Sequence, residues 1–176
     1  IAWALLELAR HPEEQNQLRS ALMKCSSKEE ARQCQELKNV TRETLRLYTP
    51  AALGSVRTLN TNVALPGTEF ILPADSYCPM PFYVLLRNGN YFEDPDSFVP
   101  SRWNHPSEAS LKAFMPFAVG SRNCPGQALA HEEMTIVLAR LLTGYEFTVE
   151  LEGKKEYMVS LRPIGAKLRV QALLAK

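Results

Sequence analysis

The chain has 176 residues, of which 45% are hydrophobic and 22% are charged, and its formal net charge at pH 7 is +1. This composition is typical of a globular domain, and the small net charge argues against both a nucleic-acid-binding patch and an acidic tail. No apolar run approaches the roughly 20 residues that a membrane-spanning helix needs, and no signal peptide is visible.

The first residues predict a helix that lacks a start signal. Residues 1–9 read IAWALLELA, which is helical and apolar from its first position, without an initiator Met or a capping Ser, Thr, Asp or Asn. We therefore expect that the sequence is cut through a helix. Pro12 then opens a second helix, whose inner face is marked by Leu18, Ala21 and Leu22.

A longer helix is predicted from about Ser27 to Tyr48. Small or apolar residues recur there at three-four spacing: Ala31, Cys34, Leu37, Thr41, Leu45 and Tyr48. This helix places Glu43 and Arg46 three residues apart, as neighbours on one side. Taken alone, such residues form a weak surface ion pair.

The pattern changes after Tyr48. Short β-like runs at residues 55–59, 69–72 and 76–80, separated by Pro and Gly, predict a small sheet. A short helix is expected over residues 81–87. Residues 88–116 are rich in Pro, Asn, Asp and Ser and predict a long ordered loop, a length that usually indicates function.

The loop ends in the string FAVGSRNCPG at residues 117–126, which has the features of a prepared thiolate. Pro125 suits the first position of a helix, so Cys124 is expected at the N-cap, with free backbone N–H groups aimed at its sulfur. Such donors and the positive end of the helix dipole stabilise a thiolate. A buried, inert cysteine before a core helix is the alternative interpretation.

Neighbouring residues in the string fit the same interpretation. Gly120 and Gly126 remove side chains where the backbone turns tightly or approaches a ligand. Phe117 is expected to cover one side of the thiolate and slow its oxidation. Arg122 offers a planar set of donors suited to a carboxylate.

The remaining segments predict one helix and several strands. A helix over residues 125–143 carries Ala130, Met134, Val137 and Leu141 on one face, and Gly144 stops it. Strand-like runs at residues 146–151, 157–161 and 167–172 close the chain. No internal repeat or domain boundary is visible. The expected fold class is mainly α with small β-sheets, an α+β fold.

Cysteine and histidine spacing indicates no other metal or disulfide site. The four cysteines, at positions 25, 34, 78 and 124, form no C-x-x-C pair and fit a reducing compartment. The histidines at positions 11, 105 and 131 have no nucleophile or metal partner at a meaningful spacing. We expect them to be solvated or to cap helices.

Three motifs, in order, resemble the haem-thiolate monooxygenases of the cytochrome P-450 family. Residues 117–133 are similar to the complete haem-binding pattern F-x-x-G-x-R-x-C-x-G-x-x-x-A-x-x-E. Glu43-Thr-Leu-Arg46 resembles the E-x-x-R of that family, and Pro100-Ser-Arg102-Trp103 resembles its P-x-R-F/W. The resemblance covers essentially all of the chain but only the last third of a typical member. Residues 1–176 are thus expected to be the C-terminal portion of a single cytochrome P-450 domain, truncated at its N-terminus.

The resemblance implies haem b as the cofactor and Cys124 as the iron ligand and catalytic residue. It also implies that Arg122 and Arg57 bind the haem propionates, and that the loop around the haem is shaped by Phe117, Gly120 and Gly126. Glu43 and Arg46 are implied to form a buried network with Arg102. One departure is Leu86-Arg87, where the family frequently has His-Arg.

The implied reaction is the insertion of one oxygen atom of O2 into a small apolar organic substrate. In the family, residues 51–56 and 158–160 face the substrate. A redox partner, either a flavoprotein reductase or a ferredoxin, is expected on the thiolate side, where the candidate basic residues are Lys38, Arg42, Lys112 and Arg140. The resemblance implies the cytoplasmic face of the endoplasmic reticulum membrane, with anchoring only through a missing N-terminal segment. No nucleic-acid partner is expected.

Two other functions remain open at this point. The proton-delivery residues of the family lie upstream of Ile1, so this chain alone is expected to be inactive. One alternative is therefore a haem-binding or redox-sensing module without oxygen activation. The other is an inactive truncated product with exposed apolar surface, because a fold cut in this way loses partners for its core faces.

Overall fold

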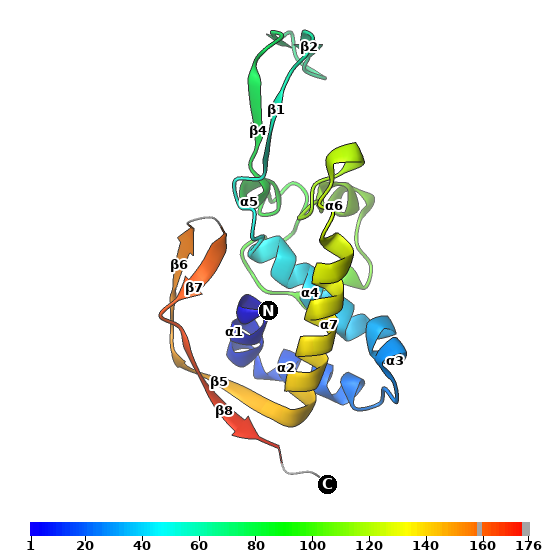
Figure 1. Cartoon of the computed structure of the whole chain (residues 1–176), viewed down its shortest axis with the longest axis vertical. Coiled ribbons are helices and arrows are strands. Elements are labelled where there is room, and N and C mark those ends of the chain that lie inside the picture. Colours follow the sequence, from blue (N-terminus) through cyan, green and yellow to red (C-terminus); the bar gives the residue numbers. More distant parts are fainter. Residues whose placement is uncertain (158–159, 174–176) are drawn as a thin grey trace.

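The computed structural model describes residues 1–157 and 160–173 and confirms an α+β fold (Figure 1). The helices are α1 (Ala2–Arg10), α2 (Pro12–Leu22), α3 (Lys28–Gln33), α4 (Gln35–Leu47), α5 (Phe82–Leu85), α6 (Glu108–Ala113) and α7 (Gln127–Gly144). Two 3₁₀ turns are η1 (Pro100–Trp103) and η2 (Gly120–Arg122). The strands are β1 (Ser55–Thr58), β2 (Val63–Ala64), β3 (Ile71–Leu72), β4 (Tyr77–Met80), β5 (Tyr145–Leu151), β6 (Lys154–Tyr157), β7 (Leu161–Ile164) and β8 (Lys167–Ala172). None of the helices in these described ranges is long and apolar enough to cross a membrane.

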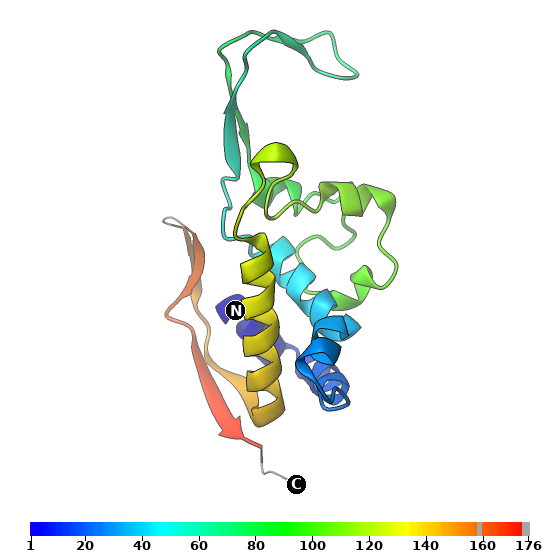
Figure 2. The ribbon, with the colours of Figure 1, turned by 45° about the vertical axis from the view of Figure 1, so that its right-hand side comes forward.

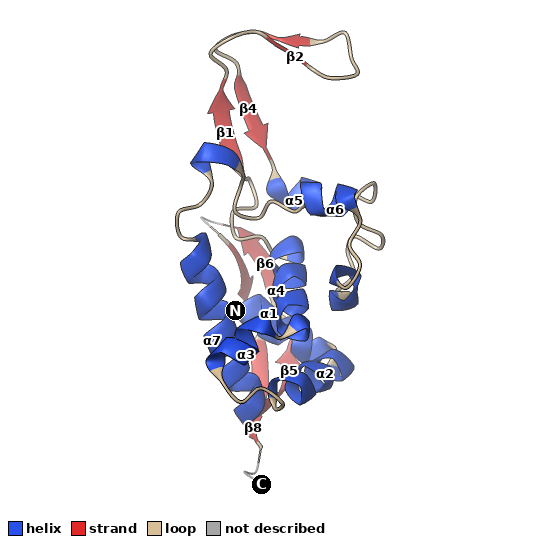
Figure 3. Cartoon of the chain, turned by 90° about the vertical axis from the view of Figure 1, so that its right-hand side faces the viewer, coloured by secondary structure: helices blue, strands red, loops and turns tan. Residues whose placement is uncertain are grey.

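The main hydrophobic core lies where α1, α2, α4 and α7 meet β5 (Figure 3). Gln15 of α2 is buried there, and its amide donates to the carbonyls of Leu8 and Phe147 at 3.0 and 2.9 Å. Its side-chain oxygen accepts from the Phe147 N–H at 2.9 Å. This one side chain therefore joins α1, α2 and β5 while leaving no polar atom of its amide unpaired.

The predicted helix over residues 27–48 is broken at Cys34, which has the extended values φ −55° and ψ 115°. Before the break, Ser27 caps α3 by accepting from the Glu30 N–H at 3.1 Å, and the Glu30 carboxylate accepts from the Ser26 N–H at 2.6 Å. No residue of α3 is buried, whereas Cys34 lies in the main core. The break lets Cys34 pack inward while α3 stays at the surface.

The inner face of α7 differs from the prediction after Met134. The fully buried residues are Met134, Leu138 and Leu142, whereas Val137 and Leu141 are only partly buried. The helix packs against both α2 and α4, and its contact face follows a four-residue spacing. The helix ends at Gly144, and β5 begins at the next residue.

A long hairpin projects from the body of the molecule (Figures 1 and 2). β1 pairs antiparallel with β4, and β2 pairs with β3 nearer the tip. The sequence predicts a strand over residues 69–72, but only Ile71–Leu72 is a strand, and β2 was not predicted at all. Both tip strands contain two residues, too few for a clear period-2 pattern.

At the C-terminus, β5 pairs with β8 and β6 pairs with β7, all antiparallel. The two ends of the predicted strand over 157–161 are strand residues, but they belong to different strands, because β6 ends at Tyr157 and β7 begins at Leu161. Met158 and Val159 lie outside the described residues. Trp3 joins α1 to this region by donating to the Leu161 carbonyl at 3.1 Å.

The predicted long loop over residues 88–116 contains η1 and α6 as well as irregular backbone. Ser107 caps α6 by accepting from the Ser110 N–H at 3.1 Å. The segment is anchored by a second hydrophobic cluster composed of Phe82, Leu86, Phe92, Trp103 and Ala113. This cluster fixes the segment that leads into the cysteine-containing string.

Candidate functional site

The cysteine loop, residues 117–126, joins α6 to α7 and is closed by its own backbone. The Cys124 N–H donates to the Phe117 carbonyl at 2.9 Å, and the Asn123 N–H donates to the Gly120 carbonyl at 3.2 Å. Ala118 and Gly120 have φ values of 59° and 81°, in the left-handed region that favours glycine. A non-glycine residue in this region indicates a constrained loop.

Cys124 does not occupy the helix N-cap that the sequence predicts. That position belongs to Gly126, with φ −86° and ψ 5°, and α7 begins at Gln127. The Cys124 carbonyl accepts from the Gln127 N–H at 3.3 Å, so Pro125 and Gly126 form a turn before the helix. Pro125 starts this turn because its fixed φ suits a turn as well as a helix start.

The thiol of Cys124 is exposed at the surface of the described residues. A Cβ atom placed on Gly126 would lie 3.8 Å from the Cys124 sulfur, at ordinary contact distance. Glycine at this position therefore keeps one side of the sulfur free of a side chain. The site offers a single sulfur ligand on an accessible loop.

Phe117 packs against His131 of α7, with ring centroids 5.1 Å apart. The sequence predicts a solvated or capping His131, but the residue is partly buried. Burial and, to a lesser degree, the charge of Arg42 lower the pKa of His131. The contact between Phe117 and His131 has one sequence signal only. His131 follows Cys124 by seven residues, which places it near the start of the helix after the loop.

The two arginines proposed from the sequence lie on different elements. Arg122 is exposed on η2, and Arg57 is partly buried on β1, where its side chain reaches only the Val56 carbonyl at 3.5 Å. Neither forms an ion pair with an acidic residue in the described part of the chain. All three ribbon views place the base of the β1–β4 hairpin and the cysteine loop at the same end of the molecular body (Figures 1–3). An unpaired guanidinium is free to bind a carboxylate of a ligand.

Glu43 and Arg46 form a fully buried, bidentate ion pair, not a surface pair. Two guanidinium nitrogens of Arg46 donate to the two Glu43 carboxylate oxygens at 2.9 and 2.8 Å, and both side chains are 0% exposed. Arg102 donates from Nε to the same carboxylate at 3.0 Å. The predicted network is thus confirmed.

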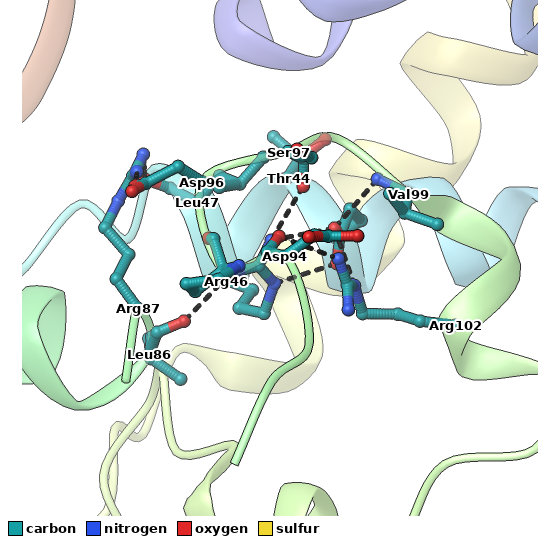
Figure 4. Close-up of polar contacts among 12 residues, drawn as sticks. Thr44, Arg46, Leu47, Leu86, Arg87, Asp94, Asp96, Ser97, Val99 and Arg102 are labelled. Carbon is teal, nitrogen blue, oxygen red and sulfur yellow. Dashed lines mark hydrogen bonds and ion pairs between the residues drawn. The ribbon is translucent and has the colours of Figure 1, made fainter. Parts of the chain in front are cut away.

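Further donors complete the network around Glu43. The Trp103 indole N–H and the Val99 backbone N–H each donate to the carboxylate at 2.9 Å. Arg46 also donates to the backbone carbonyls of Leu86 and Ser97 at 3.0 Å each. Figure 4 shows Arg46 reaching from α4 towards the following loop, and Arg102 entering from η1. The sequence motif identified the charged residues but not the indole or the main-chain partners.

Arg87, at the position where the family frequently has the second residue of a His-Arg pair, holds the end of α4. It donates to the Leu47 carbonyl at 2.9 Å and pairs with Asp96 (Figure 4). The preceding Leu86 is fully buried in the second cluster. An apolar residue therefore fills the place where the family has an imidazole.

The four candidate basic residues for partner docking are not equivalent. Lys38 and Arg42 line one cavity of about 300 Å³ between α4 and α7, which His131 also lines. Lys112 is paired with Glu108 at 2.6 Å. Arg140 lies farther along α7 and lines a different cavity.

In the described ranges, no three His, Cys, Asp or Glu side chains come together as ligands for a bare metal ion. Of the segments expected to face a substrate, residues 51–56 are described, and Leu53 and Val56 expose more than half of their surface. Of residues 158–160, only Ser160 is described.

A model of the cytochrome P-450 family matches residues 1–168. This chain belongs to the cytochrome P-450 family. Membership implies a haem cofactor, in agreement with the accessible cysteine and the unpaired arginines described above.

The P-450 chain is similar to several curated proteins over most of its length. It is 29% identical to the mitochondrial cholesterol side-chain cleavage enzyme of Hypanus americanus over 93% of this chain and 32% of that protein. It is 33% identical to the mitochondrial 25-hydroxyvitamin D-1 alpha hydroxylase of Homo sapiens, over 85% of this chain and 31% of that protein. It is 34% identical to cytochrome P-450 4d2 of Drosophila melanogaster, over 83% of this chain and 30% of that protein. The chain spans about a third of the length of these relatives.

These similarities correct the expected location. The sequence resemblance implied the endoplasmic reticulum membrane, but several of the most similar relatives are named as mitochondrial P-450 proteins. The motifs on which the expectation rested are common to the whole family, so they carry no information about the compartment. The endoplasmic reticulum assignment is therefore wrong.

Proposed function

We propose that the protein containing this chain is a haem-thiolate monooxygenase that inserts one oxygen atom of O2 into an apolar organic substrate. Residues 1–176 form the C-terminal portion of its single cytochrome P-450 domain, and Cys124 is the iron ligand of haem b. The observation that carries the proposal is the accessible Cys124 on a loop closed by its hydrogen bond to Phe117, in a chain whose family match covers residues 1–168.

The residues around Cys124 fit a haem group. Gly126 leaves one side of the sulfur open, and the unpaired guanidinium groups of Arg57 and Arg122 supply cations for the two propionates. Phe117 and Gly120 shape the loop that holds the sulfur in place. Bound haem supplies the redox chemistry of dioxygen activation, which no amino-acid side chain provides.

The protein contributes a fixed ligand and controlled access. Glu43 binds Arg46 of α4 to Arg102 and Trp103 of η1, so the helix and the segment leading to the cysteine loop move as one unit. A rigid support of this kind keeps the sulfur at one position relative to the macrocycle.

We propose a mitochondrial protein that receives electrons from a ferredoxin-type partner. The names of the mitochondrial relatives support this location. The cavity between α4 and α7 is lined by three basic residues, Arg32, Lys38 and Arg42. Because Arg32 is paired with Glu29 and Glu132, Lys38 and Arg42 are the better candidates for contact with an acidic partner. The ion pair between Lys112 and Glu108 makes Lys112 a weaker candidate.

The proposed substrate is apolar. Leu53 and Val56 in the segment after α4 expose apolar surface, which supports contact with such a molecule. Two of the relatives are named for cholesterol and for 25-hydroxyvitamin D, and these names support an apolar substrate class. Because the chain spans about a third of the length of these relatives, turnover of substrate is proposed for the full-length protein.

The decisive test is replacement of Cys124 in the full-length protein. Cys124→Ala is expected to abolish the red-shifted Soret band that thiolate-ligated haem gives when reduced under carbon monoxide, because alanine supplies no axial ligand. Cys78→Ala, in the β1–β4 hairpin, is the matched control and should keep the band.

Two results would redirect the interpretation. A Soret position typical of histidine ligation, or absence of haem in the unmodified protein, would exclude the proposed ligand. A normal thiolate band without oxygenated product, across a panel of apolar substrates and with reduced ferredoxin present, would favour the haem-binding or redox-sensing alternative.

A further inference from the structure

A second cavity lies between α7, α3 and the loop that joins α2 to α3, separate from Cys124. Its volume is about 530 Å³, larger than the cavity of about 300 Å³ between α4 and α7. Volumes in this range are typical of sites for small molecules. We refer to it as the α3–α7 cavity.

The floor of the α3–α7 cavity is apolar. Leu22 is 4% exposed and belongs to the main core, and Cys25, Ala31 and Ala139 pack against that core from the cavity side. These side chains are small or already held in place by the core. The apolar part of a ligand could therefore pack against them without a change in the protein's conformation.

The rim is basic, and no Asp or Glu lines it. Its charged residues are Lys28, Arg32 and Arg140. Arg32 is neutralised by ion pairs with Glu29 and Glu132. Lys28 and Arg140 have no ion-pair partner among residues 1–157 and 160–173. Arg140 therefore stands without an ion-pair partner in the described ranges beside an apolar floor. Lys28 adds a second positive charge, which is partly offset by Glu132, whose pKa is lowered by Arg32 and also by Lys28.

We propose that the α3–α7 cavity binds a small amphipathic anion, a class of ligand outside the monooxygenase function proposed above. The apolar part of the ligand packs on Leu22 and Ala139, and its anionic head lies at Lys28 and Arg140. A medium-chain carboxylate and an alkyl sulfate both belong to this class, because each carries one compact anionic group at the end of an apolar chain.

Cys25 makes the proposal testable at the cavity itself. The haem-loaded full-length protein is treated with N-ethylmaleimide, and the alkylation rate of each cysteine is followed by peptide mass spectrometry. Decanoate, below its micelle concentration, is expected to slow alkylation of Cys25 at least threefold. Cys78, partly buried like Cys25 but on β4, is the internal reference and should not respond.

Comparison of three probes separates the contribution of the anionic head to binding from that of the apolar chain. Decyl sulfate should protect Cys25 as decanoate does if any compact anionic head suffices, whereas protection by decanoate alone would narrow the class to carboxylates. Decanol, which has the same chain without the charge, should protect weakly. Equal protection by decanol and decanoate, or no protection by either anion, would overturn the proposal.

Variants test the assigned residues. Arg140→Gln should weaken decanoate binding about tenfold, the effect of one charge-assisted hydrogen bond, and Ala139→Phe should abolish it by filling the cavity. Lys112→Gln and Ala109→Phe, on α6, are the matched controls.

If Arg140→Gln weakens ferredoxin binding but no probe protects Cys25, the rim belongs to a protein interface and the ligand site is refuted. The carbon monoxide spectrum of each variant reports the haem site separately, so failure of one proposal does not imply failure of the other.

Discussion

At the scale of single residues, Glu43 combines full burial with an unusually complete set of partners. One carboxylate oxygen accepts from Arg46, Arg102 and the Val99 backbone, and the other accepts from Arg46 and Trp103. A buried charge is tolerated only when it is paired in this way, since the desolvation cost is otherwise unmatched.

We therefore expect Glu43→Gln to lower the free energy of unfolding by about 3 to 5 kcal/mol, because it leaves the buried Arg46 without its counter-charge. Urea unfolding followed by circular dichroism measures the loss. Glu69→Gln, at an exposed position between β2 and β3, is the control and should change stability by less than about 0.5 kcal/mol. A similarly small loss for Glu43→Gln would show that the network contributes no more than a surface ion pair.

His131 gives a second prediction at this scale, concerning pH. Burial and the nearby Arg42 lower its pKa in the folded protein. The unfolded chain therefore binds a proton at a higher pH than the folded chain does, so stability falls as the pH drops through the unfolded value of about 6.5. His131→Gln should reduce the stability difference between pH 7.5 and pH 5, measured by urea unfolding at both values. His105→Gln, whose ring is exposed, is the control, and an equal reduction in both variants would contradict this role for His131.

At the scale of elements, the break at Cys34 shows that the spacing of apolar residues predicts which positions of a helix are buried but not where the helix is interrupted. The three-four pattern from Ala31 to Tyr48 identified the inward-facing residues of α4, such as Leu37 and Leu45, which are buried. No Gly or Pro marks the break itself. The backbone leaves the helix there because Cys34 packs into the main core while α3 remains on the surface, which is a tertiary effect.

The base of the β1–β4 hairpin provides a prediction about one glycine. Gly54 has φ +68°, and a Cβ atom there would lie 1.8 Å from the Met80 carbonyl oxygen. Gly67, at the hairpin tip, has φ +74° but nothing within 4 Å. Gly67→Ala should cost about 1 kcal/mol through backbone strain alone, and Gly54→Ala roughly 3 kcal/mol or more, because β1 and β4 must also separate. Equal losses in thermal melts would show that the close approach to Met80 is unimportant.

The charged network was predictable from the sequence, whereas the local geometry at Cys124 was not. The spaced motifs predicted the contacts of Glu43 with Arg46 and Arg102, which are confirmed, and the role of Cys124 as an iron ligand stays a prediction. Sequence reasoning placed Cys124 at the N-cap of α7 because Pro125 is common at helix starts, whereas the chain uses that proline in a turn. A local preference shared by turns and helix starts cannot distinguish them.

At the scale of the whole molecule, packing is uneven. The main core draws on residues from Trp3 to Leu161, whereas the hairpin beyond Gly54 is largely exposed, with Phe70 at 72% and Tyr77 at 77%. The fold class followed from the alternation of helical and strand-like runs. The pairing of β5 with β8 around the β6–β7 hairpin could not be read from those runs, since it depends on contacts across the chain.

Hydrogen exchange should show this unevenness directly. Backbone amides of α4 and α7 are expected to exchange only through global unfolding, because their inner faces lie in the main core. Amides of β2 and β3 should exchange many times faster, since each strand is two residues long and exposes most of its side chains. Exchange in native buffer, read by mass spectrometry of peptides, measures both. Protection at the tip equal to that of α7 would mean that the hairpin unfolds only with the body.

The Glu43 network also bears on the order in which the chain acquires its structure. The Trp103 indole that donates to Glu43 lies 60 residues later in the sequence, and the carbonyls that bind Arg46 lie 40 to 51 residues later. During synthesis, α4 is therefore made before the groups that complete its buried charge network. Closing such long loops is entropically costly and slow. Glu43 can therefore gain its complete set of partners only after η1 has been synthesised.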